Sequence, residues 1–380
     1  MRNKGALAGG LAVLLLAGGC WDYRELDTLA IAAGAALDQG EQGEKIFTAQ
    51  LADLQEPDKA EARLTEGRGA SFLAAGQQAA AKTGRKLYFG HAQTVVVSQQ
   101  IARQDIRPVL DYISRQNDSL LSLRLMISRQ STAAEILEAQ PASESLSGFE
   151  LSVQASEKGQ NGLDMPFYRF YSEIREEGID PFLPAVSTPE GQEGGAQLEG
   201  AALFRRNQLR GFLDPEQTET LMLLRGMKPQ NPLTLERTAQ QGGDAALTLN
   251  DCRLDSQVGL DEAGRPWARL TLTVEAGLGE LEGDQNIMSE QGRRQLEEQC
   301  AALLKGRAEE LVLLLQQYEC DALGLGLTLS RFEPESWKSL KEDWRKTFAQ
   351  TPIETEVQVK ITGAGRMYLP VSMEEGEQNG

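Results

Sequence analysis

Cys20 carries the thiol whose surroundings most clearly specify a chemistry. It follows a basic start over 1–4, a mostly apolar run over 6–17 and the small residues Gly18 and Gly19. A short apolar segment that ends in small residues is typical of a secretory signal and its cleavage site. A cysteine directly after that site predicts attachment of a diacylglyceryl group to the thiol, and cleavage that leaves Cys20 as the N-terminus.

Two other interpretations of this segment are an ordinary signal peptide and a membrane span. The apolar run is shorter than the roughly 18–20 residues that a span needs. Ordinary secretion would leave a free N-terminal thiol without a purpose. Ala17 stands where lipoprotein signals commonly have leucine, which is found one residue earlier at Leu16. We therefore predict lipidation. Its two or three acyl chains, at about 0.8 kcal/mol per buried CH₂, would hold the protein stably at a membrane.

Other residues capable of catalysis or metal binding are sparse. His91 is the single histidine, and no Gly-x-Ser-x-Gly segment surrounds any serine. His-Glu-x-x-His, Cys-x-x-Cys and EF-hand patterns are also absent from the sequence. Glycine pairs at 277–279 and 324–326 are too short for a phosphate-binding loop. The sequence therefore predicts no catalytic residue, no metal site and no cofactor, and a structural place for His91 at a strand bend.

Three further cysteines, Cys252, Cys300 and Cys320, have an odd number and a spacing that fits no metal site. Export would permit a disulfide, but we favour three small, partly buried apolar residues. Trp337 and Trp344 could stack on a sugar, yet their helical spacing favours packing in a core.

The formal net charge of the chain is −18, and loss of the signal removes two further cations. Such a surface repels nucleic acid and anionic headgroups. The composition therefore argues against nucleic-acid binding and against a basic face that lies on a membrane.

The elements that must position these residues alternate without a regular βαβ rhythm, which indicates an α+β fold. Period-two alternation or apolar runs predict strands, and 3.6-residue periodicity predicts helices. Predicted strands cover 29–37, 46–54, 87–91, 94–98, 121–128, 201–204, 209–213, 247–259, 267–276 and 353–361. Predicted helices cover 71–82, 105–115, 165–177, 215–224 and 289–318. A short helix is also predicted from the capping-box spacing at 132–135, and one further helix carries Trp337, Leu340, Trp344 and Phe348.

About 360 mature residues exceed the 100–200 residues of a typical single domain. We expect three consecutive mixed domains, with largely antiparallel sheets and packed helices, after the cleaved signal. The predicted division is a signal over 1–19, an N-terminal domain over 20–140, a middle domain over 141–230, a C-terminal domain over 231–370 and a disordered acidic tail over 371–380.

Several short motifs, spread over nearly the whole mature chain, resemble those of one known family. They are Cys20-Trp-Asp-Tyr-Arg-Glu-Leu26, Phe89-Gly-His91 before a valine-rich strand, Pro108-Val-Leu-Asp111, Ala201-Ala-Leu-Phe204 with Gly211-Phe-Leu213, Asp321, Gly324-Leu-Gly326, Trp337, Asp343-Trp344 and Phe348. The chain resembles the Ger(x)C family, the lipoprotein C subunits of nutrient germinant receptors. It departs from the family pattern at Ala17, Phe212 and Cys320.

The resemblance implies three α+β domains, no enzymatic activity and a place on the outer face of the spore inner membrane. It also implies two integral membrane subunits as partners, in a complex that senses small nutrients and triggers germination. Whether this subunit touches the nutrient is left open. Trp21, Asp22, Arg24 and Glu25 are candidate partner contacts, because they are charged or aromatic and close to the bilayer; packing of Trp21 on the first domain and a local Arg24–Glu25 pair are the alternative.

Two other classes are weaker. A solute-binding lipoprotein of a transporter has two α/β lobes with repeated strand–helix alternation, whereas this chain predicts hairpins and long helices. An envelope hydrolase is disfavoured by the single histidine and the absent metal motifs.

Overall fold

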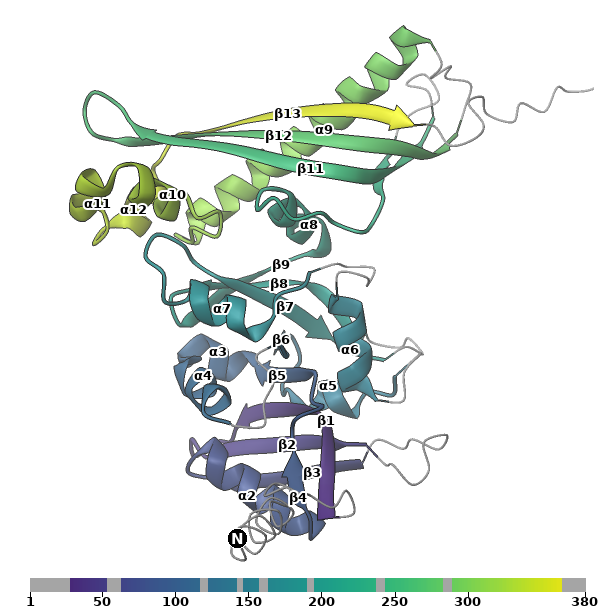
Figure 1. The fold of residues 1–380 in the computed structure, drawn as a ribbon, viewed down its shortest axis with the longest axis vertical. Coiled ribbons are helices and arrows are strands. Elements are labelled where there is room, and N and C mark those ends of the chain that lie inside the picture. The colour runs from purple at the N-terminus through teal and green to yellow at the C-terminus, as the bar shows by residue number, and fades with distance from the viewer. Residues whose placement is uncertain are drawn as a thin grey trace, which may run out of the picture.

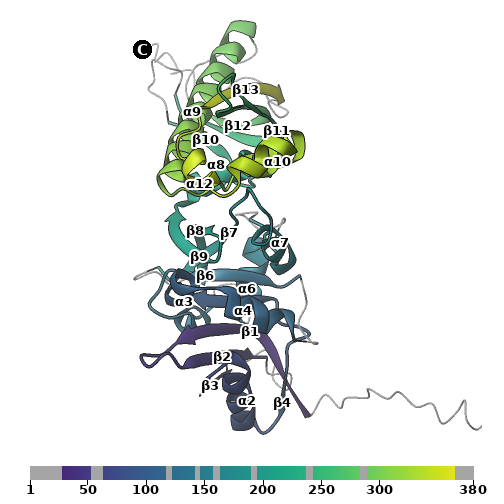
Figure 2. The same cartoon turned by 90° about the vertical axis from the view of Figure 1, so that its left-hand side faces the viewer.

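The computed structural model describes residues 28–52, 63–116, 122–141, 146–156, 163–189, 195–236, 243–282 and 289–363. Its elements are stacked along one long axis, as Figure 1 and the perpendicular view in Figure 2 show. The earliest strands lie at one end, the strands from the middle of the chain follow, and the last strands lie at the other end.

The larger sheet contains nine strands of the described chain, in the order β3-β2-β1-β5-β6-β7-β8-β9, with β4 beside β1. The hairpins are antiparallel, whereas β1, β5, β6 and β7 run parallel to one another. Its strands are β1 (Leu29–Gln39), β2 (Lys45–Leu51), β3 (Arg63–Gly69), β4 (Lys86–Tyr88), β5 (Thr94–Ser98), β6 (Arg124–Ser128), β7 (Phe182–Ser187), β8 (Gln197–Arg205) and β9 (Gln208–Leu213).

Short helices cover this sheet. They are α2 (Phe72–Thr83), α3 (Gln99–Gln104), α4 (Arg107–Ser114), α5 (Ala134–Glu138), α6 (Ser147–Ala155), α7 (Phe167–Glu173) and α8 (Pro215–Leu223). Their ends follow local chemistry. The Ser71 hydroxyl caps α2, and Gly84 ends it in the left-handed region at φ 66°. Asp214 and Gln217 form a capping box at the start of α8.

The smaller sheet is built from β10 (Leu233–Leu235), β11 (Ala245–Leu260), β12 (Pro266–Leu281) and β13 (Ile353–Gly363), in that order. β11 and β12 form a long hairpin, and β13 joins β12 in parallel. The long helix α9 (Glu290–Gln317) crosses this sheet, and α10 (Leu325–Phe332), α11 (Pro334–Leu340) and α12 (Trp344–Phe348) gather at one end of it (Figure 1).

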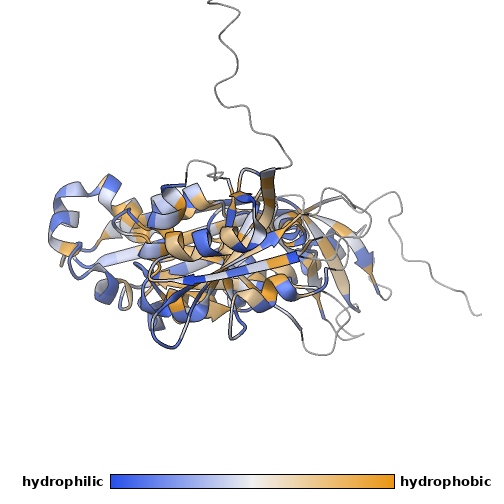
Figure 3. Cartoon of the chain, turned by 90° about the horizontal axis from the view of Figure 1, so that it is seen from below, coloured by the Kyte–Doolittle hydropathy of each residue, from blue (hydrophilic) through white to orange (hydrophobic). Residues whose placement is uncertain are grey.

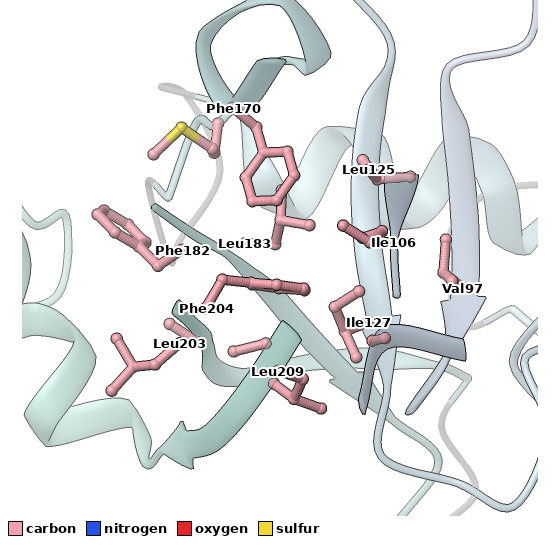
Figure 4. Packing of buried hydrophobic residues seen from close by; sticks show 14 of the residues in the cluster. Val97, Ile106, Leu125, Ile127, Phe170, Phe182, Leu183, Leu203, Phe204 and Leu209 are labelled. Atoms are coloured by element: carbon pink, nitrogen blue, oxygen red, sulfur yellow. The ribbon is translucent and has the colours of Figure 1, made fainter. Parts of the chain in front are cut away.

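The largest core lies in the larger sheet and continues into the helices of the smaller one. Figure 4 shows Phe170 pointing toward Phe204, and the two rings meet edge to face at 5.2 Å between centroids. Phe182 and Ile127 lie in the same layer of side chains. This core joins α7 to strands from both halves of the sheet.

The α+β class is confirmed, and most predicted elements are present, although both sheets mix parallel and antiparallel strands. The sheet crosses residue 141, a predicted domain boundary, because β6 pairs with β7. Three details of the prediction are wrong. β6 is not half-buried, since Met126 and Ser128 on its second face are fully covered. The helix α3 was not predicted. The single helix expected around Trp337 and Phe348 is broken into α11 and α12.

Among the described residues, Cys252, Cys300 and Cys320 form no disulfide, and the last two are buried. No helix in the described parts of the chain has the length and apolar character needed to cross a bilayer.

Candidate functional site

The sequence-predicted site lies outside the described residues. Cys20, Trp21, Asp22, Arg24 and Glu25 all precede Thr28, where the description begins. Their roles remain predictions. Within the described ranges, no group of three or more His, Cys, Asp or Glu side chains is arranged to hold a metal ion.

The most elaborate polar arrangement is centred on Asp321, where α9 gives way to α10. Asp321 is fully buried. Its Oδ1 accepts hydrogen bonds from the amides of Gly324 (2.9 Å) and Leu325 (3.1 Å). Its Oδ2 accepts from the Gly326 amide (2.8 Å) and from Trp344 Nε1 (2.9 Å). The carboxylate therefore caps α10 and fixes the indole of α12 at the same time.

Burial raises the pKa of the Asp321 carboxyl to about 6. The hydrogen bonds from Gly326, Trp344 and Leu325 act in the opposite direction, and the nearby charge of Asp180 adds to the rise in pKa. Desolvation outweighs the donors, because a charge without water around it is costly even when it is well hydrogen-bonded.

Asp180 joins this arrangement from the larger sheet, just before β7. It is 1% exposed, and its amide donates to the Asp321 carbonyl at 2.9 Å. Asp180 Oδ2 accepts from the Asp321 amide at 3.1 Å, and Oδ1 accepts from Arg345 Nη2 of α12 at 2.7 Å. Asp180 and Asp321 thus bind each other's backbone, with Arg345 as the neighbouring cation. We call these residues with Trp344 the junction cluster.

Two glycines allow the backbones to meet there. A Cβ on Gly326 would lie 2.4 Å from Trp344 Nε1 and 2.8 Å from the Gly178 Cα. Gly178 has φ 80° and accepts a 2.7 Å hydrogen bond from the Leu327 amide. Only glycine suits such a close approach of two chains. The junction cluster therefore locks the helices of the smaller sheet onto the larger sheet.

Aromatic packing adds to the contacts at the junction cluster. The rings of Trp337 and Trp344 meet edge to face at 5.3 Å, and Phe348 is fully buried beside them. The prediction that both tryptophans pack in a core is confirmed. Asp343, another residue of the family-like motifs, is exposed and pairs with Lys346 at 3.7 Å.

A cleft of about 490 Å³ opens beside the junction cluster. Its walls come from α4, the 174–180 segment, the β8–β9 turn, α11 and α12. Exposed charges of both signs line it, among them Arg175, Glu176, Arg206 and Glu342. Such a cleft can accept polar groups of a ligand or of a partner chain, at a place that the buried carboxylates hold fixed.

Sequence reasoning found only part of this arrangement. Asp321 and Gly326 were noted for their resemblance to family motifs, without a role, and Trp344 was predicted to pack in a core. Asp180 and Arg345 were missed. The signal that could have pointed to Asp180 is the turn-forming segment 178–181, in which glycine, aspartate and proline come together.

Family models match both halves of the chain. One, described as "Spore germination protein N-terminal domain", matches residues 22–188, and another, "Spore germination B3/ GerAC like, C-terminal", matches residues 199–365.

Two proteins of Bacillus subtilis (strain 168) are similar over almost their entire length. Spore germination protein B3 is 23% identical, with 93% of this chain and 96% of that protein covered. The putative spore germination protein YfkR is 22% identical, with 95% and 97% covered.

Among solved structures, the crystal structure of the GerBC protein matches with a TM-score of 0.59 and 19% identity. The match covers 90% of this chain and 100% of that one, so the two share a fold. Since the two family models together run from residue 22 to residue 365, the chain belongs to the Ger(x)C family of spore germination proteins.

Proposed function

We propose that the protein is a membrane-anchored lipoprotein subunit of a nutrient germinant receptor that is required for bacterial spore germination. The observation that carries the proposal is the family match over both halves of the chain, together with relatives that are named as spore germination proteins. In this proposal the chain sits on the outer face of the spore inner membrane and works with two integral membrane subunits.

The anchor in this proposal is the lipid on Cys20, which follows the signal-like segment over 1–19. The segment from Trp21 to Glu25 then lies closest to the bilayer, where Trp21, Asp22, Arg24 and Glu25 contact the membrane subunits. The role is one of assembly and not of catalysis. The junction cluster supports it, because its buried carboxylates accept hydrogen bonds from the backbone, from Trp344 and from Arg345, and in this way hold elements in place.

The architecture counts against a solute-binding lipoprotein of a transporter, the alternative function. The two sheets differ in strand number and order, so the described chain does not divide into two similar α/β lobes.

The test is a pull-down of the tagged full chain from detergent-solubilised spore inner membrane. Wild type is compared with Cys20→Ala and with Cys252→Ala, a matched change at a half-buried free thiol. We expect two polytopic subunits to co-purify with wild type and with Cys252→Ala, and to be lost with Cys20→Ala. Recovery of a transporter permease and ATPase instead would overturn the proposal.

The partner-contact residues have a separate test. The double variant Arg24→Glu with Glu25→Arg keeps one acidic and one basic side chain, so a local ion pair between the two positions is preserved. Either change alone gives two like charges and removes that pair. If Arg24 and Glu25 contact the membrane subunits, the double reversal also reduces co-purification. Intact assembly in the double variant would show that the two residues only pair locally.

A further inference from the structure

A basic surface lies at the turn that joins α2 to β4. Lys82, Arg85 and Lys86 are exposed within five consecutive residues, and we call the segment 82–86 the basic corner. Among the described residues, no carboxylate forms an ion pair with any of these three side chains. They are free to meet an external anion.

The basic corner stands out from the charge of the whole molecule, and it is a local exception to the expectation from composition that no basic face lies on the membrane. The chain has 56 acidic residues and a net charge of −18, yet it contains no aspartate or glutamate from Gly67 to Gln104. Lys82, in the last turn of α2, favours the helix end through its dipole. That structural role does not extend to Arg85 and Lys86, which follow the helix-ending Gly84.

The position of the basic corner relative to the anchor follows from strand pairing. β4 runs parallel to β1, and Leu29 is the register partner of Lys86. The start of β1 and the basic corner therefore lie at the same edge. Figures 1 and 2 place α2 and β4 at the end of the long axis farthest from β13. Figure 3 views the molecule from that end, with each described residue coloured by its hydropathy.

The tether to this end is short. Cys20 precedes Thr28 by eight residues, which span at most about 28 Å when fully extended. A lipid on Cys20 would hold the basic corner within a few Debye lengths of the headgroups, given about 8 Å per Debye length at physiological ionic strength. The local concentration of headgroups at the corner is accordingly high.

We propose that the basic corner rests on anionic phospholipid headgroups and sets the orientation of the protein on the membrane. The inference rests on the lipid anchor of the proposed function. Each cation near an anionic surface strengthens binding about fivefold, so three together give on the order of 100-fold. The acidic remainder of the molecule is repelled by the same surface, and the long axis is therefore expected to stand away from the bilayer.

The experiment uses the full lipidated chain on vesicles of pure phosphatidylcholine or of phosphatidylcholine mixed with phosphatidylglycerol, an anionic lipid that attracts basic segments. Flotation measures anchoring. Acetylation of lysine amines, followed by mass spectrometry, measures contact. Lys305 and Lys338 are exposed lysines of the smaller sheet's helices and serve as internal controls. Arg85→Gln tests the corner, and Arg294→Gln, an exposed arginine of α9, is the matched variant.

We expect flotation with both vesicle types. Anionic vesicles should slow acetylation of Lys82 and Lys86 at least fivefold, with no change at Lys305 or Lys338. Arg85→Gln and 0.5 M salt should weaken this protection, while Arg294→Gln should not. Flotation with equal acetylation rates on both vesicle types would overturn the proposal that the basic corner contacts anionic headgroups, and it would leave the proposed lipid anchor unaffected. Absence of flotation on phosphatidylcholine would refute the proposed lipid anchor. The proposed contact of the basic corner would then also be refuted, because it depends on that anchor.

Discussion

Replacement of Asp321 by asparagine should change how the stability of the protein depends on pH. The ordinary pKa of 3.8 and the folded-state value of about 6 differ by an amount that corresponds to ~3 kcal/mol. Because the folded-state pKa is raised, the ionised carboxylate is disfavoured in the folded protein. Protonation of Asp321 therefore stabilises the fold. This contribution is present below the unfolded pKa and is lost as the pH rises through about 6.

Asparagine does not titrate, and its amide can accept hydrogen bonds with only one of its two terminal atoms. At pH 7.5 Asp321→Asn loses charge-assisted bonds worth ~1.5–3 kcal/mol each, but it also avoids the desolvation of a charge. We expect it to be at most ~3 kcal/mol less stable than wild type there. Between pH 7.5 and pH 4 the wild type should gain a further ~2–3 kcal/mol over the variant.

The assay is urea unfolding followed by tryptophan fluorescence at several pH values, since Trp337 and Trp344 lie in the junction cluster or against it. Asp343→Asn is the control, because it makes the same chemical change at a carboxylate that is 77% exposed. Its difference from wild type should stay flat over the same pH range. A gap between wild type and Asp321→Asn that stays constant, or that narrows toward pH 4, would refute the reasoning.

Three other substitutions, two of them with a control substitution, test packing and backbone hydrogen bonds by urea unfolding. Gly326→Ala should cost ~3 kcal/mol because its added Cβ would lie 2.4 Å from Trp344 Nε1. Its control, Gly306→Ala in the middle of α9, places the added Cβ in open space and should stabilise by ~0.5–1 kcal/mol. Phe204→Ala should cost ~3–5 kcal/mol, and Tyr168→Ala, 57% exposed, should cost less than ~1 kcal/mol; equal costs would contradict the described core. Asp38→Ala leaves two backbone amides at the start of α5 without their acceptor and should cost ~1–3 kcal/mol, and an unchanged free energy of unfolding would contradict that role.

Local patterns predicted most of the elements. Ser71 caps α2, Gly84 ends it, Asp214 caps α8 and β13 alternates, and each of these features has a short-range signal in the sequence. The break between α10 and α11 was also visible in principle. Pro334 cannot continue α10, because proline lacks the amide that an interior helical position needs.

What could not be predicted depends on contacts between distant parts of the chain. The alternation in the sequence predicts that Met126 and Ser128 lie on an exposed face of the strand. Both are buried, because β6 lies between β5 and β7 and further elements pack over it. The junction cluster joins Asp180 to Asp321, which are 141 residues apart. No spacing rule links them, and a sequence with 56 acidic residues offers no reason to choose these two.

The contact between β6 and β7 has a mechanical consequence. Two register pairs join these strands, Ile127 with Ala185 and Ser128 with Val186, and the Arg129 amide donates one further hydrogen bond to the Val186 carbonyl at 2.8 Å, although the strands lie in the middle of a nine-stranded sheet. Partial opening of a protein follows its weakest cooperative boundary. Tension applied between the two ends of the long axis should therefore separate β6 from β7 first. The Phe170–Phe204 ring contact opposes this separation. Hydrogen exchange would then show two blocks of protected amides, one on each side of the β6–β7 contact, that open independently.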